Sequence, residues 1–382
     1  MSSSTTRHEG ASKESDPLLC NTSPSITIKA TAENVYNTEN NDLEIGEAKT
    51  SSLNSTQMIG RVTLAFVAFL YGTLNVSLRM LYALPNPPSA SALSTTRGWL
   101  AAFAFLPFAP RVKQEITSDQ YSKQSTRRAL HLAALELALW NFGAQGLLNV
   151  GLLFTDAARA AFFTQTSVVM TPLLSYFSGG DVRKSVWLGC FIALMGLIIL
   201  SSSNSSDDDV VEDETTAVAS SSSWFYLGTG DIIVLAGAAS WSMYIFRVSS
   251  LSQYHPEVSL QAFKTIYLAC MYTTWFICSA AIRYATTDDN DKWASVLDLW
   301  RGYNDWKAWL ILFYSAAGPG TIADILQQGG QKYVSASEAN VILCGEPVFT
   351  ALLSRFVLHE IASKMEYLGG SLIILAAILA SI

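Results

Sequence analysis

The stretch at residues 185–202 decides the class of this protein, because it reads SVWLGCFIALMGLIILSS and contains no charged side chain. An α-helix rises about 1.5 Å per residue, so a helix of this length approaches the ~30 Å hydrocarbon core of a bilayer. Similar apolar blocks recur along the 382-residue chain, which is 50% hydrophobic and only 14% charged. Soluble domains average about 25% charged residues, so the sequence predicts a polytopic membrane protein.

The apolar blocks predict an all-α fold of ten transmembrane helices. Their expected ranges are 62–84, 89–109, 129–153, 157–178, 185–202, 225–250, 257–283, 308–330, 336–358 and 363–382. Only the turn PNPP at 85–88 separates the first two ranges, and only Thr155 and Asp156 separate the third from the fourth. Connections this short join antiparallel neighbours, so we expect two helical hairpins.

Basic residues in the short loops predict the orientation. Arg61 precedes the first range, a basic cluster follows the second, and Arg183 and Lys184 follow the fourth. Such residues tend to stay on the cytosolic side, so we expect both termini in the cytosol. The Ser/Asp-rich linker at 203–223 then lies on the opposite side, together with the glycosylation sequon at Asn204.

The composition of residues 1–57 predicts a disordered cytosolic tail, because this segment is rich in polar residues and lacks an apolar signal-peptide region. Their acidic residues argue against an organellar transit peptide. Glu14, Leu18 and Leu19 match an acidic dileucine signal, which sorting adaptors bind, although short motifs of this kind also arise by chance. The plasma membrane and a vacuolar or endosomal membrane both stay open as the location.

Neither cysteine nor histidine spacing predicts a metal or cofactor site. The five cysteines include no CxxC pair, and His131, His255 and His359 lie near the ends of different ranges. The chain also lacks HExxH and GxSxG motifs, so we expect no cofactor and no catalytic residues. No basic patch indicates nucleic acid, which leaves a small solute and membrane lipid as the expected partners.

An internal repeat divides the chain. TDAARAA at 155–161 begins the fourth range, and VSASEAN at 334–340 begins the ninth at an equivalent point. We therefore expect two related five-helix halves at 58–202 and 224–382. An odd number of spans per half inverts the second copy in the membrane. Inverted repeats are typical of alternating-access transporters, whose substrate site lies between the halves near the bilayer midplane.

Two polar stripes occupy equivalent helices of the halves. Asn141, Gln145 and Asn149 recur every fourth residue in the third range, and the repeat pairs Gln145 with Asp324 and Asn149 with Gln328 in the eighth. Polar groups are costly in hydrocarbon unless they face a cavity or a partner. We expect Gln145 and Asp324 to line a central cavity; the alternative is that the amides join helix to helix.

Several segments share one order and spacing with a known family. These are YGTLN at 71–75, TDAARAAFFT at 155–164 with VVMTP at 168–172, GD at 230–231 with ASWS at 239–242, and VSASEAN at 334–340 with EPV at 346–348. Together they resemble the EamA-type family of the drug/metabolite transporter superfamily. The resemblance implies ten helices around a central cavity and transport of a small organic solute. Glu338 departs from the family pattern, and no substrate carries over.

Charged residues inside the ranges are hypotheses for binding or ion coupling. Glu346 precedes Pro347, and it either binds a cation or pairs with Arg97 or Arg355. Arg97 has Glu136 as a second possible partner. We expect Lys264, near the start of the seventh range, to extend toward the membrane surface.

For three further residues the sequence leaves open whether they contribute to the site or have a structural role. Arg159 begins the fourth range and faces water, an acid or an anionic ligand, because a cation at a helix amino terminus opposes the helix dipole. Asn75 and Trp241 lie on the first helices of their halves and either reach the cavity or pack between helices.

The leading functional hypothesis is a multi-pass transporter that moves a small organic metabolite by alternating access. A sugar-phosphate or nucleotide-sugar carrier is the alternative within the superfamily, and it requires several unpaired basic residues in the second half. Only Lys264, Lys332 and Arg355 are near the expected cavity in that half. A non-transporting membrane scaffold is the other alternative, and the absence of a cavity would favour it.

Overall fold

The computed structural model describes residues 55–84, 87–118, 124–151, 154, 163–204, 228–287, 291–301, 305–357 and 364–381. All regular elements in these ranges are helical. The predicted tail, the dileucine residues Glu14, Leu18 and Leu19, nearly all of the predicted linker, and Arg159 lie outside the described residues. The disordered tail and the sorting signal therefore stay predictions.

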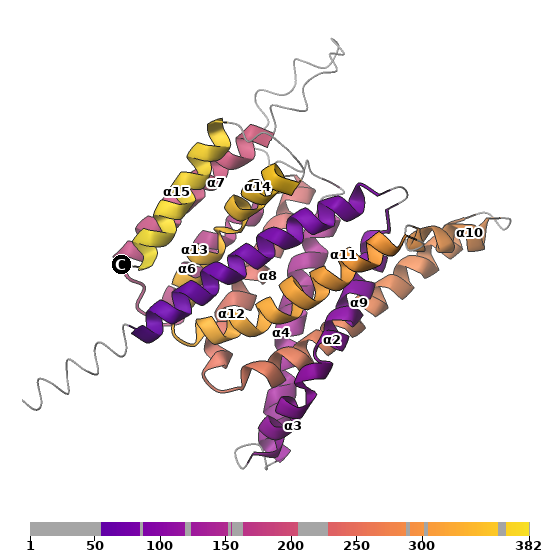
Figure 1. Cartoon of the computed structure of the whole chain (residues 1–382), viewed down its shortest axis with the longest axis horizontal. Helices are drawn as coiled ribbons and strands as arrows, with labels where there is room; N and C mark the ends of the chain where they lie inside the picture. The colour runs from indigo at the N-terminus through magenta and orange to yellow at the C-terminus, as the bar shows by residue number, and fades with distance from the viewer. Residues whose placement is uncertain are drawn as a thin grey trace, which may run out of the picture. The chain divides into compact units, whose positions relative to one another are not determined.

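The first helix runs Ser55–Tyr82. The other elements of Figure 1 are α2 Ala90–Ala104, η1 Leu106–Phe108, α3 Ala109–Thr117, α4 Gln124–Gly151, α6 Ser167–Phe177, α7 Lys184–Asn204, α8 Thr229–Ser252, α9 Glu257–Thr286, α10 Lys292–Leu297, η4 Asp298–Trp300, α11 Trp306–Ala316, the π-helical η5 Ala317–Ile322, α12 Ala323–Gln331, α13 Ala336–Leu343, α14 Glu346–Val357 and α15 Lys364–Ser381.

Several of these helices are long and apolar enough to cross a bilayer. Five stretches within the described residues meet both conditions: Ser55–Tyr82, Thr229–Ser252, Glu257–Thr286, Trp306–Gln331 and Ala336–Val357. Large apolar side chains such as Phe103, Leu132 and Phe191 are at least 60% exposed, as expected for surfaces that face lipid. The described part of the chain is therefore all-helical and contains helices that are long and apolar enough to span a membrane, whereas the count of ten stays a prediction.

Three predicted ranges contain breaks. The range 89–109 is interrupted after Ala104, because Pro107 and Pro110 lie in the first turns of η1 and α3, where proline fits best. The eighth range contains the π-helical η5, which includes Gly318 and Pro319. The ninth range breaks between α13 and α14, where Pro347 lacks the backbone N–H that would continue the helix.

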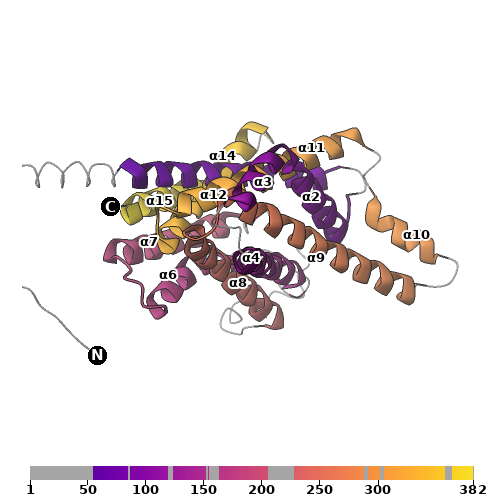
Figure 2. The ribbon, with the colours of Figure 1, turned by 90° about the horizontal axis from the view of Figure 1, so that it is seen from below.

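The buried core forms where the first helix, α4, α8, α9 and α13 meet. Val67, Leu137, Tyr244, Leu260 and Leu343 belong to one cluster there, and each is at most 8% exposed. Figure 2 shows α4 nearly end-on beside α8 and α9, the two helices against which it packs most closely. This arrangement holds helices of both predicted halves against one another.

Two pairs of glycines allow equivalent helix crossings. A Cβ atom at Gly330 on α12 would lie 3.1 Å from the carbonyl oxygen of Gly60 on the first helix. A Cβ atom at Gly151 on α4 would lie 3.2 Å from the carbonyl oxygen of Gly230 on α8. Small residues permit this close approach of helix backbones in membranes. The first helix of each predicted half thus crosses the third helix of the other half.

Candidate functional site

A cavity of 1020 Å³ lies among the helices, and it is large enough for a small organic molecule. The first helix, α2, α4, α8, α9, α12, α13 and α14 all contribute lining residues, so both predicted halves form its wall. Along the first helix the lining runs from Tyr71 to Arg79, near its carboxyl end at Tyr82. The cavity therefore extends from mid-helix toward the end of the bundle opposite Ser55.

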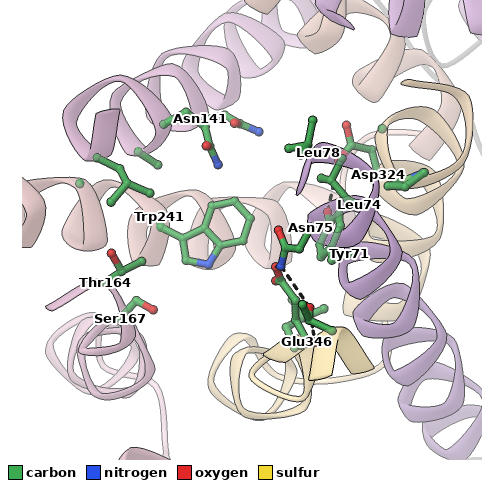
Figure 3. A pocket seen from close by; sticks show the side chains of 18 of the residues that line it. Tyr71, Leu74, Asn75, Leu78, Asn141, Thr164, Ser167, Trp241, Asp324 and Glu346 are labelled. Atoms are coloured by element: carbon green, nitrogen blue, oxygen red, sulfur yellow. Dashed lines mark hydrogen bonds between the residues drawn. The ribbon is translucent and has the colours of Figure 1, made fainter. Parts of the chain in front are cut away.

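Most of the site residues expected from the sequence line this cavity. They are Asn75, Arg97, Asn141, Gln145, Trp241, Asp324 and Glu346. Figure 3 shows the Trp241 indole between Asn141 on one side and Thr164 and Ser167 on the other, with Asn75 and Glu346 beyond it. The cavity brings together amides, charges of both signs and an aromatic ring. Substrate binding by these residues stays a prediction.

Asn149 and Gln328 are not among the lining residues, in contrast to their predicted position. Gln328 is fully buried, accepts a hydrogen bond from Gln261 Nε2 at 3.1 Å, and donates one to the carbonyl oxygen of His255 at 3.3 Å. The alternative interpretation of the stripe, an amide that joins helices, holds for Gln328. Asn149 lies one turn beyond Gln145, where α4 leaves the cavity wall.

Asp324 is held by Lys264 in the wall of the cavity. Lys264 Nζ lies 2.5 Å from Asp324 Oδ2, and the lysine side chain is only 1% exposed. The Tyr71 hydroxyl lies 3.4 Å from the other carboxylate oxygen and donates to Gln327 Oε1 at 2.7 Å. The expectation that Lys264 extends to the membrane surface is wrong, because its side chain turns inward to a carboxylate. Lys264 and Asp324 are 60 residues apart in the chain, and no local sequence pattern predicted that they would pair.

Glu346 contacts an amide instead of the arginine predicted as its partner. Asn75 Nδ2 donates to Glu346 Oε1 at 2.7 Å and lies 3.3 Å from Thr350 Oγ1. Neither Arg97 nor Arg355 forms an ion pair with it in the described part of the chain. Glu346 begins α14, and the amino-terminal turn of a helix favours a negative charge.

Arg97 lines the cavity without a carboxylate partner among the described residues. Its Nε is buried and makes no hydrogen bond. Glu136, the other predicted partner, forms a bidentate pair with Arg247, with distances of 2.5 and 2.8 Å. The Arg97 guanidinium is therefore available to a bound molecule.

Glu338 belongs to a structural ion network away from the cavity lining. Its two carboxylate oxygens lie 2.7 Å from Arg61 Nε and 2.5 Å from Arg183 Nη2, and its side chain is 4% exposed. Ser335 caps the same end of α13 by accepting a hydrogen bond from the backbone N–H of Glu338. The network joins the first helix, the segment before α7 and the start of α13.

The family model of the EamA-like transporter family matches residues 58–202 and 228–382. The chain belongs to the EamA-like transporter family. The two matched segments are two copies of one repeat, and the described helices fit a multi-pass membrane transporter. The chain is thus a member of a transporter family.

One curated protein and one solved structure resemble the chain over most of its length. A protein of Archaeoglobus fulgidus described as an uncharacterized transporter is 26% identical over 320 residues, which cover 84% of each chain. A solved structure described as "Crystal structure of protein" has a TM-score of 0.60 at 15% identity and covers 85% of this chain and 96% of its own. The second likeness supports the fold alone.

Proposed function

We propose that this EamA-like protein is a carrier that moves a small organic solute across a membrane by alternating access. The observation that carries the proposal is the 1020 Å³ cavity, whose wall combines Arg97, Asp324 and Glu346 with uncharged amides. Intramembrane charges are retained where they contact a solute, an ion or one another. The cavity also argues against a scaffold without transport activity.

The proposed architecture is ten transmembrane helices in two inverted five-helix repeats, 58–202 and 224–382. Two matched family segments support the repeat. The equivalent crossings at Gly60 with Gly330 and at Gly230 with Gly151 support the inversion, because each joins the first helix of one half to the third helix of the other. The residues at 203–223 connect the halves.

In the proposed site, polar groups from both halves bind the solute. Gln145 and Asn141 supply amides from α4, and Asn75 supplies one from the first helix. Trp241 presents its ring, Arg97 attracts negative charge, and Asp324 and Glu346 attract positive charge or a coupling proton. Arg159 stays a candidate from the sequence alone, and the roles of Asn149 and Gln328 are structural in this proposal.

The sugar-phosphate alternative receives less support from the contacts. It needs unpaired basic residues in the second half, yet Lys264 pairs with Asp324 and Lys332 pairs with Glu257. Both termini are proposed to face the cytosol, in a plasma or vacuolar/endosomal membrane.

Uptake by purified protein in proteoliposomes, measured against a panel of radiolabelled metabolites, tests the proposal. We expect saturable uptake of at least one solute, and competition by related solutes. The matched control is Asp291→Asn, which removes an exposed carboxylate outside the cavity, and it should transport normally. A water-soluble thiol reagent should also reach Gln145→Cys. The absence of both uptake and labelling would overturn the proposal.

A further inference from the structure

Matching polar stripes on α9 and α12 face each other on one side of the cavity. The stripe on α9 comprises Gln261, Lys264 and Thr265, whose spacing places them on one helical face. The stripe on α12 has the same kind of spacing and comprises Asp324, Gln327, Gln328 and Gln331. The two helices pack against each other, and each of the four glutamines is at most 1% exposed.

The two stripes contain several hydrogen-bonding atoms without partners, although Gln327 Oε1 accepts from Tyr71 on the first helix. Within the described residues, Gln261 Oε1, Gln327 Nε2, Thr265 Oγ1 and both polar side-chain atoms of Gln331 are buried and make no hydrogen bond. Buried polar groups are nearly always paired, because an unpaired group loses its hydration without compensation. Unpaired polar atoms on both α9 and α12 fit helix surfaces that meet water or solute in another conformation.

The stripes connect the cavity to the end of the bundle where the first helix begins. Thr265 and Asp324 line the cavity, and Gln331 is the last residue of α12. Beyond it, the ammonium group of Lys332 pairs with Glu257, and Gln253 Nε2 donates to the carbonyl oxygen of Lys332 at 2.8 Å. These contacts close that end of the interface.

The equivalent interface in the first half is open. α2 and α4 lie in the second and third predicted spans of the first half. α9 and α12 lie in the second and third predicted spans of the second half. Arg97 on α2 and Gln145 on α4 both line the cavity, and α2 and α4 do not pack closely against each other, whereas α9 and α12 do. The two related interfaces therefore differ, one being open and the other packed.

A hinge precedes α12. The π-helical segment Ala317–Ile322 contains Gly318, Pro319 and Gly320, and it joins α11 to α12, which follow each other beside the first helix (Figure 1). π-Helical turns and proline weaken the regular hydrogen-bond ladder, and glycine widens the allowed backbone angles. Tyr314, before the hinge, donates to Thr73 Oγ1 at 2.9 Å, which attaches α11 to the first helix.

We propose that the α9/α12 interface is the closed second half of the solute path, and that α12 moves about residues 317–322 to open it. The open passage leads from the cavity to the end where the first helix begins. Its amide lining binds water and the uncharged hydrogen-bonding groups of the passing solute. The proposal rests on the carrier function and adds the route and the moving element.

Cysteine accessibility in proteoliposomes tests the passage. Gln261→Cys and Gln331→Cys are made separately in the full chain with the five native cysteines replaced, and a charged thiosulfonate is added from the side of the amino terminus. Ile277→Cys, at a 59% exposed position on α9 outside the proposed hinge, is the control. The passage cysteines should react at least about tenfold faster than the control, because the reactive thiolate forms only where water enters.

A cross-link provides the second arm. A short bifunctional thiol reagent that joins Glu257→Cys to Lys332→Cys should hold the interface closed and protect both passage cysteines. Gln145→Cys, labelled from the opposite side, should react with or without the cross-link. If Gln145→Cys reacts while neither passage cysteine reacts faster than Ile277→Cys, the proposed passage is overturned and the carrier function survives. If Gln145→Cys is also unreactive from both sides, the carrier function itself fails.

The hinge has its own test. A Cβ atom at Gly320 would meet Ser315 and Ala101 at 3.4 and 3.6 Å, which are ordinary contacts, so Gly320→Ala should fold. Its reduced backbone freedom should slow labelling at Gln331→Cys and solute exchange by roughly two- to fivefold, and leave labelling of Gln145→Cys unchanged. Unaltered labelling of Gln331→Cys would show that α12 does not turn at this segment.

Discussion

Lys264 of α9 and Asp324 of α12 form an ion pair in the cavity wall, with Nζ 2.5 Å from Oδ2. The lysine is 1% exposed and the aspartate 16%, so only the carboxylate reaches the cavity. A buried charge without its partner is strongly unfavourable. Asp324 therefore has two separable roles, one in neutralising Lys264 and one toward the solute.

The first prediction separates these roles. Asp324→Asn should abolish uptake and also lower the thermal stability, because loss of one partner of a buried pair costs about 3–5 kcal/mol. The double variant Asp324→Asn with Lys264→Gln should regain stability but not uptake. Melting temperature in detergent and uptake in proteoliposomes measure the two effects. Normal uptake by the double variant would remove Asp324 from the site.

The second prediction concerns Gln145, which lines the cavity, and Asn149, which does not. Gln145→Ala should weaken solute binding about two- to tenfold, because one hydrogen bond contributes roughly 0.5–1.5 kcal/mol. Asn149→Ala should leave the affinity unchanged. Competition binding on the purified protein provides both values, and equal effects of the two variants would contradict the cavity assignment.

The third prediction concerns the Glu338 network. Glu338→Gln removes the charge that holds Arg61 and Arg183, and should destabilise the protein by about 1.5–3 kcal/mol, as expected for hydrogen bonds to charged groups. Arg301→Gln is the control, because both side chains of its pair with Asp298 are exposed, and such a pair is worth about 0–1 kcal/mol. The thermal unfolding of Glu338→Gln and of the control variant is compared. A larger loss from the exposed pair would be inconsistent with the assigned network.

The fourth prediction compares two adjacent glycines. A Cβ atom at Gly330 would lie 2.9 Å from Leu64 Cγ, whereas nothing lies within 4 Å of one at Gly329. Gly330→Ala should force the first helix away from α12 and cost about 1–3 kcal/mol, a typical result of overpacking. Gly329→Ala should be near neutral. The unfolding temperatures of the two variants test the crossing directly.

The fifth prediction concerns topology. An impermeant thiol reagent outside intact cells should label Ser205→Cys and spare Ser52→Cys in a protein that reaches the cell surface, because the basic loops place the amino terminus inside. Surface delivery is checked with an extracellular tag in the linker. Labelling of Ser52→Cys alone would reverse the orientation.

The membrane class, the repeat and the family resemblance followed from the sequence, and most of the site residues expected from the sequence line the cavity. Apolar length is a local property that one helix displays without its neighbours. The stripe that contains Asn141 and Gln145 was visible for the same reason, because residues four apart share a helical face. Asn75 and Trp241 were identified on the first helices of the two halves, and both line the cavity.

Only the tertiary structure decided how far each stripe reaches and which partner each charge takes. Residues four apart differ by about 6 Å along the helix axis, so Gln145 lines the cavity while Asn149 lies past its edge. Lys264 takes Asp324, Glu346 takes Asn75, and Gln328 turns to α9. These pairs join residues far apart in the chain, and they depend on the rotation and tilt of whole helices, which local sequence patterns leave undetermined.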